Sequence, residues 1–113
     1  MIAWLANHPP TIVHWLLLST LLFTVGLFGV LTRRNAIGIL MAVEILLNVA
    51  ALNFVVFGHF RTPGAADGQV MALFIIATAA AEVVVGMAIF VALYRHRKSI
   101  DVTAMNQIQD ETN

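Results

Sequence analysis

The chain has 113 residues, of which 60% are hydrophobic and only 11% are charged, and it contains no cysteine. A water-soluble fold of this size needs polar side chains over most of its surface, which so few charges cannot supply. The net charge of zero, with no basic stripe among aromatic residues, gives no sign of nucleic-acid binding. Without cysteine, these residues form no disulfide and cannot ligate an iron–sulfur cluster through thiolates.

Three long apolar segments follow one another, over residues 12–31, 36–57 and 70–94. A hydrocarbon core is about 30 Å thick and needs roughly 20 helical residues to cross it. Because the apolar runs are continuous rather than alternating, they favour helices over strands. We therefore predict an all-α membrane protein with three transmembrane helices and a single membrane domain over residues 1–113. The third and longest helix is expected to tilt or to extend beyond the lipid.

The first segment is a membrane helix rather than a cleaved signal peptide. Residues 1–13 contain no Lys or Arg, whereas Arg33 and Arg34 follow the apolar run. A signal peptide has the reverse order of charge.

The connections between the segments are short. Residues 32–35 join the first pair, and residues 58–69, with Pro63, Gly64, Asp67 and Gly68, predict a surface loop before the third. A polar tail over residues 95–113 follows. Asp101 is a candidate N-cap there, and Met105 with Ile108 is a candidate apolar stripe, so we expect a short tail packed on neighbouring protein.

The basic residues predict the orientation. The loop over residues 32–35 and the C-terminal flank lie on the same side of the membrane, and together they contain five basic residues, whereas the other side has only Arg61. The five are Arg33, Arg34, Arg95, Arg97 and Lys98. The positive-inside rule then places the N-terminus outside and the C-terminus in the cytoplasm. Trp15 and Tyr94 are expected near opposite interfaces, where such rings act as anchors.

Two acids, Glu44 and Glu82, are the only charged residues well inside the apolar segments. A central acid costs on the order of 2.5 to 3.5 kcal/mol, whereas each Leu or Ile returns about 0.3 to 0.6 kcal/mol. Acids retained at such a cost indicate an ion or proton pathway. The alternative is a purely structural hydrogen bond between helices.

The depths of the two acids differ on a simple count of residues. Glu44 lies roughly 12 Å, and Glu82 about 18 Å, from the cytoplasmic end of its segment at about 1.5 Å per residue. We expect this offset of about 6 Å to prevent a direct hydrogen bond, so that proton transfer needs water or another side chain. A low-dielectric surrounding disfavours the charged form of an acid, which suits a group that takes up and releases protons.

Polar residues lie one turn from each acid. Asn48 follows Glu44 on the same helix face, and Thr78 precedes Glu82. Either can bond a carboxyl group or a water. Equally, Thr78 can bond its own backbone and Asn48 can pair across a helix contact. Asn53 faces away from Glu44.

No Lys, Arg or His lies beside either acid in its own segment. Three helices also offer little interior in which to enclose two acids, so we expect an obligate subunit surrounded by helices of other chains. The sequence has no nucleotide-binding glycine motif, metal-ligand cluster or nucleophile–base set, so it is expected to bind no cofactor and to be non-redox by itself.

Two stretches resemble a known family. RRNAIGILMAVEILLNVAALNF (33–54) and DGQVMALFIIATAAAEVVVGMAIFVALYRHR (67–97) look like the K subunit of respiratory complex I, the proton-pumping NADH-quinone oxidoreductase, called subunit 4L in mitochondria. The resemblance covers about residues 20–105, and an acid within LMAVEILLN combined with one within ATAAAEVVVG is specific.

The resemblance implies a non-redox subunit of an enzyme in the bacterial inner membrane. Glu44 and Glu82 then correspond to relay acids, and Arg33 and Arg34 to a basic pair in the cytoplasmic loop, for which membrane anchoring is an equal alternative. NADH, FMN, iron–sulfur clusters and quinone are expected in partner subunits. Subunits of the A, J, H and N types are the expected membrane neighbours.

Other assignments stay open. The stretch from Tyr94 to Val102 also resembles the ferredoxin- and plastoquinone-linked relative of the complex, and membrane-bound hydrogenases have a related subunit. Multisubunit Na+/H+ antiporters share the three helices, although we do not expect an acid like Glu44 there. A purely structural scaffold would use both acids only for packing and would tolerate their replacement by glutamine.

Overall fold

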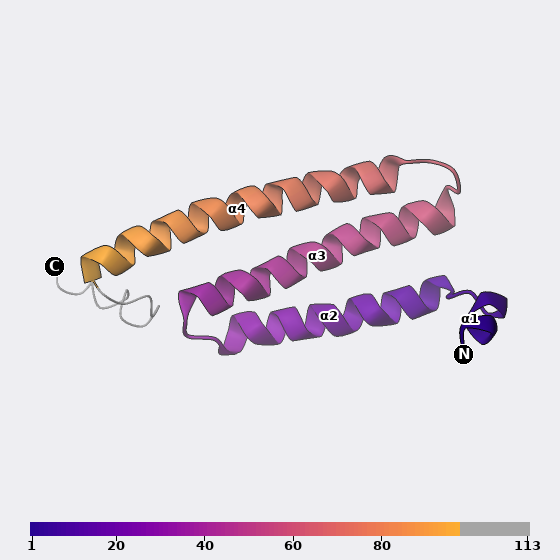
Figure 1. The fold of residues 1–113 in the computed structure, drawn as a ribbon, viewed down its shortest axis with the longest axis horizontal. Helices are drawn as coiled ribbons and strands as arrows, with labels where there is room; N and C mark the ends of the chain where they lie inside the picture. Colours follow the sequence, from indigo (N-terminus) through magenta and orange to yellow (C-terminus); the bar gives the residue numbers. More distant parts are fainter. Residues whose placement is uncertain (98–113) are drawn as a thin grey trace.

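A computed structural model describes residues 1–97 of the chain (Figure 1). Within this range the backbone forms a short helix, α1 (Ile2–Asn7), and three long ones, α2 (Ile12–Thr32), α3 (Ala36–Arg61) and α4 (Asp67–Arg97). Each of the long helices is long and apolar enough to cross a membrane, which confirms the predicted all-helical fold with three such helices. Most of the predicted polar tail, including Asp101, Met105 and Ile108, lies outside the described residues.

The loop between α3 and α4 is shorter than predicted. It covers residues 62–66 instead of 58–69, because α3 continues to Arg61 and α4 already begins at Asp67. Asp67 lies in the first turn of α4, where a carboxylate interacts favourably with the helix dipole. The chain reverses at Gly64, whose φ of 89° suits glycine.

Helix α1 was not predicted. The ring of Trp4 stacks on that of His8 with 4.7 Å between centroids, and Nδ1 of His8 lies 3.0 Å from the carbonyl oxygen of Trp4. Pro9 and Pro10 then interrupt the helical backbone. The next helix begins after Thr11.

Helix α3 is the centre of the fold, with α2 packed along one side and α4 along the other (Figure 1). Its contact with α2 is close at two glycines. A Cβ at Gly26 would lie 2.7 Å from Cδ2 of Leu46, and one at Gly29 would lie 2.8 Å from Cβ of Ala42. Only residues without a side chain allow the backbones to approach so closely.

The contact of α3 with α4 is closest near the loop. A Cβ at Gly68 would collide with the backbone of α3, at the carbonyl oxygen of Phe54 and the Cα of Gly58. The interfaces of α3 are otherwise built from small buried residues, namely Ala36, Ala42, Val49, Ala51, Val56, Ala72 and Ala79.

Many large apolar side chains face outward, away from the contacts between the helices. Only 6% of the spanning window of α4 is buried against the rest of the chain. Large residues such as Leu17, Phe28, Leu73 and Val84 are more than half exposed. An apolar exterior of this extent is suited to lipid or to other membrane helices.

Candidate functional site: two acids at the contact of α3 and α4

Glu44 lies on the stripe of α3 that faces α4. Two contacts define this stripe: Leu40 packs at Gly86, with both Cδ atoms 3.5 Å from where a Cβ would be, and Gly58 packs at Gly68. Residues three and four positions apart share one face of a helix. Glu44 follows Leu40 by one turn and precedes Gly58 by about four turns, so it belongs to the same face.

The carboxyl group of Glu44 is partly enclosed by its own chain. Its Oε1 atom is buried, and no group of the described residues forms a hydrogen bond with it. A buried polar atom without a partner costs about 1–3 kcal/mol. The site therefore favours a hydrogen-bond donor brought to Glu44 from outside the described residues.

Glu82 has a different environment, since its side chain is exposed. It lies beside the row of α4 residues that faces α3, which includes the buried Ala79 and the half-buried Gly86. A carboxyl group exposed in the middle of a spanning helix is unfavourable in lipid. Helix α4 thus needs cover on this side from something other than α2 or α3.

The two acids lie level with each other. Helices α3 and α4 are antiparallel and Leu40 packs at Gly86; four residues further along α3 is Glu44, and four residues back along α4 is Glu82. The pair of glycines near the loop follows the same register. The predicted offset of about 6 Å was therefore wrong, because counting from the predicted ends of the segments ignored how the two helices pair.

The side chains of the two acids nevertheless diverge. On a helical wheel of about 100° per residue, Glu44 lies about 40° from the contacting positions of α3, and Glu82 lies about 40° from those of α4. Because the helices are antiparallel, these deviations fall on opposite sides of the contact. Level acids on opposite sides explain why Glu82 does not satisfy the buried oxygen of Glu44.

The two polar residues next to the acids, Asn48 and Thr78, both lie on exposed parts of their helices. Asn48 is exposed on α3, one turn beyond Glu44. Thr78 is also exposed, and its hydroxyl donates to its own helix, at the carbonyl oxygens of Phe74 (3.0 Å) and Ile75 (2.9 Å). Of the two interpretations left open for Thr78, the bond to its own backbone is the one observed.

Arg33 and Arg34 lie at the far end of the layer, in the exposed linker between α2 and α3. The backbone N–H of Arg33 donates to the carbonyl oxygen of Gly29 at 3.1 Å and ends α2. Asn35 then caps α3, since its side chain accepts from the backbone N–H of Ile37 at 2.8 Å. The arginines thus border the start of the helix that carries Glu44.

One polar contact was not foreseen. The hydroxyl of Ser19, which is 5% exposed, donates to Oδ1 of Asn53 at 2.7 Å and joins α2 to α3. Asn53 faces away from Glu44, as predicted, whereas its pairing with Ser19 was not predicted. An isolated serine in an apolar segment is the signal that could have identified it.

The described residues hold no group of three or more His, Cys, Asp or Glu side chains that could bind a metal ion. The acids at the α3–α4 contact are therefore the notable chemical groups inside the spanning part. Their arrangement can hold and pass a proton if further polar groups or water connect them.

Several known proteins are similar in sequence to this chain. Residues 14–110 match the family described as NADH-ubiquinone/plastoquinone oxidoreductase chain 4L. The NADH-quinone oxidoreductase subunit K of Brevibacillus brevis is 42% identical over 88% of this chain and 96% of its own length. Its counterpart from Nitrosospira multiformis is 49% identical over 85% of this chain and 92% of its own length. The NAD(P)H-quinone oxidoreductase subunit 4L of a Synechococcus strain is 41% identical over 84% of this chain and 93% of its own length.

Proposed function

The chain belongs to the chain 4L family of NADH-quinone oxidoreductases, and we propose that, as the membrane-arm subunit K, it carries two acids of the proton-transfer route coupled to quinone reduction. The observation that carries this proposal is the buried Oε1 of Glu44, which has no hydrogen-bond partner within residues 1–97 and lies level with Glu82 on the adjacent helix. A carboxyl group enclosed in low dielectric and left without a fixed partner is suited to exchange a proton.

The geometry indicates how the two acids would work together. Since they point to opposite sides of the α3–α4 contact, a proton passes between them through water or through a side chain of another subunit. Asn48, exposed one turn from Glu44, is positioned to orient such a water. Thr78 already donates to its own backbone, so it can only accept a further hydrogen bond near Glu82.

The enzyme's redox chemistry belongs to other subunits in this proposal. NADH, FMN, iron–sulfur clusters and quinone would be bound there, and this chain would contribute no redox group. Helices of A-, J-, H- and N-type subunits would surround it. Arg33 and Arg34 would lie on the cytoplasmic side of a bacterial inner membrane, with the N-terminus outside.

The proposal is tested in the whole complex. Membrane vesicles carrying Glu44→Gln are assayed for NADH-to-quinone electron transfer and for proton pumping, with assembly checked on a native gel. Glutamine preserves shape and most hydrogen bonding but cannot carry the proton. We expect assembly to persist and coupled turnover to fall by about tenfold or more, within the range of proton-transfer catalysis.

Asp67→Asn is the matched control, because Asp67 is an exposed acid at the start of α4 and outside the apolar span. It should leave pumping unchanged. If Glu44→Gln also turns over and pumps at the parent rate, the relay assignment is wrong, and a scaffold that uses the acid for packing is the better assignment.

The proposed cover over Glu82 has its own test. Ile89 lies two turns after Glu82 on the same side of α4 and is 52% exposed. A photoreactive p-benzoylphenylalanine at this position should form an adduct with another subunit of the complex. Adducts with lipid alone would contradict the proposal that protein covers this side.

A further inference from the structure

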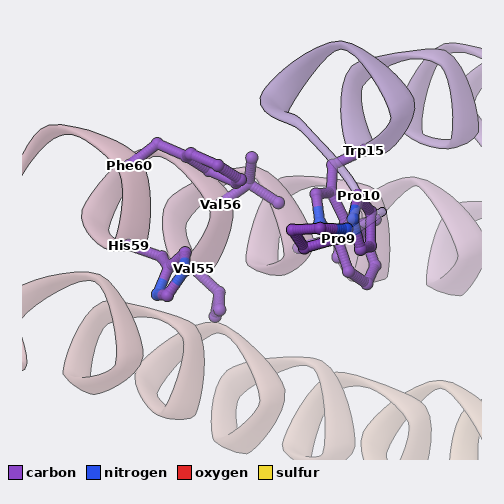
Figure 2. A pocket seen from close by; sticks show the side chains of 8 residues that line it. Pro9, Pro10, Trp15, Val55, Val56, His59 and Phe60 are labelled. Carbon is purple, nitrogen blue, oxygen red and sulfur yellow. The ribbon is translucent and has the colours of Figure 1, made fainter. Parts of the chain in front are cut away.

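An apolar pocket lies at the end of the layer opposite the two arginines (Figure 2). Its volume is about 390 Å³, within the range of roughly 300–1,000 Å³ typical of small-molecule sites. Pro9, Pro10 and Trp15, from the linker after α1 and the start of α2, form one wall. Side chains of the last turns of α3 form the other, among them Val55, His59 and Phe60.

The pocket is suited to hydrocarbon rather than to water. Its lining is almost entirely carbon, and the nitrogen atoms of Trp15 and His59 are its main polar groups. A water needs two to four polar partners, which a lining of this kind does not supply. The space is therefore one that an apolar chain would fill.

The position of the pocket favours lipid as the source of that chain. His59 lies two residues before the end of α3 at Arg61, so the pocket reaches from the apolar part of the helix to its polar end. Rings such as Trp15 and His59 place a polar tip at the level of lipid headgroups and an apolar body below it.

The polar residues around the pocket also favour a phospholipid. His8 and His14 line the neighbouring cavity on the other side of Pro9 and Pro10, and His59 lies in the pocket itself. No Asp or Glu occurs before Glu44, and the acid at this end, Asp67, begins α4. Imidazole N–H groups without competing carboxylates are suited to donate to a phosphate.

We propose that this pocket binds one acyl chain of a membrane phospholipid, whose phosphate accepts a hydrogen bond from His59. The site is separate from the acids at the α3–α4 contact and does not depend on their role. Its occupant would fix the linker after α1 against the end of α3.

The test uses the whole complex reconstituted with phosphatidylethanolamine that carries a diazirine on one acyl chain. After illumination, labelled peptides are identified by mass spectrometry. We expect labelling around Val55 to exceed that around Phe28, an exposed apolar residue of α2 far from the pocket. Val55→Trp should reduce the pocket label about tenfold, because the indole fills space that the chain occupies, and should leave the Phe28 label unchanged.

A second arm tests the headgroup. Diacylglycerol with the same diazirine chain has no phosphate, so it should label the pocket several-fold less than the phospholipid. His59→Leu should remove this difference, since leucine keeps the apolar bulk but cannot donate. Equal labelling by both probes in the parent complex would overturn the proposed bond to His59.

A third arm identifies a competing occupant. A p-benzoylphenylalanine at Val55 should give lipid adducts if the proposal is right. Adducts with another subunit, or labelling by phospholipid no stronger than at Phe28, would show that protein covers the pocket and would overturn the lipid site. The second and third arms therefore remain decisive even if the complex that carries Val55→Trp does not assemble.

Discussion

Helices α3 and α4 each carry one acid at the same level, but their surroundings differ. In α3, which packs between two neighbours, 22% of the spanning window is buried, whereas in α4 the share is 6%. Glu44 accordingly has a buried oxygen, and Glu82 is exposed. The chain by itself therefore prepares the environment of only one acid, and the environment of the other is left to the assembled complex.

The largest effect is expected where the register of the two helices is set. Gly68→Ala would place a Cβ against backbone atoms of α3, at the Phe54 carbonyl and the Gly58 Cα, which cannot move aside as a side chain can. Overpacking of this kind costs about 1–3 kcal/mol. We expect a severe loss of assembled complex on a native gel.

Gly86→Ala is the matched control at the other end of the same contact. Its Cβ would meet only the Cδ atoms of Leu40 at 3.5 Å, an ordinary van der Waals distance, so assembly should be normal. If both variants assemble equally well, the close approach at Gly68 does not hold the helices, and the level placement of the acids loses its support.

The next effect concerns the two acids as a unit. Glu82→Gln should lower coupled turnover by about tenfold or more, as proposed for Glu44→Gln. If both acids serve one route, the double variant should be no worse than the more impaired single variant, because groups that act together are not additive. Pumping in vesicles normalised to assembled complex measures this.

A fully additive double variant would contradict a shared route. It would indicate that Glu44 and Glu82 act on separate pathways. Glu82→Asp is the useful companion variant, since it keeps the carboxyl group, which can carry a proton, and shortens the side chain by one methylene. Recovery of turnover with aspartate would separate a need for the carboxyl group from a need for the bulk of the side chain.

The helices and the acids could be predicted from the sequence because both depend on local signals. Long apolar runs predict spanning helices, and an acid such as Glu44 within one is evident by its cost. The depth of Glu82 relative to Glu44 could not be predicted, because it depends on where Gly68 allows α4 to pack against α3. Distances counted along one chain cannot reveal the pairing of two helices.

The polar neighbours show the same limit. Asn48 and Thr78 each lie one helical turn from an acid. Thr78 nevertheless bonds to its own backbone, whereas Asn48 is exposed and forms no such bond in the described residues. Which alternative a hydroxyl takes depends on the rotamer and the adjacent helix, neither of which is contained in the spacing. The pairing of Ser19 with Asn53 likewise depends on the contact of α2 with α3.

That pairing supports the smallest prediction, on the α2 side of α3. Ser19→Ala removes the 2.7 Å hydrogen bond and leaves Oδ1 of Asn53 without its partner. Hydrogen bonds between membrane helices contribute about 0.6 kcal/mol on average and at most about 1.7 kcal/mol. We expect a lower temperature of heat dissociation for the detergent-solubilised complex, with turnover retained below that temperature. Thr20→Ala is the control, since Thr20 donates only to the carbonyl oxygen of Leu16 in its own helix, at 2.8 Å. Equal effects of the two substitutions would mean that the contact of α2 with α3 depends on the glycines at positions 26 and 29 rather than on this bond.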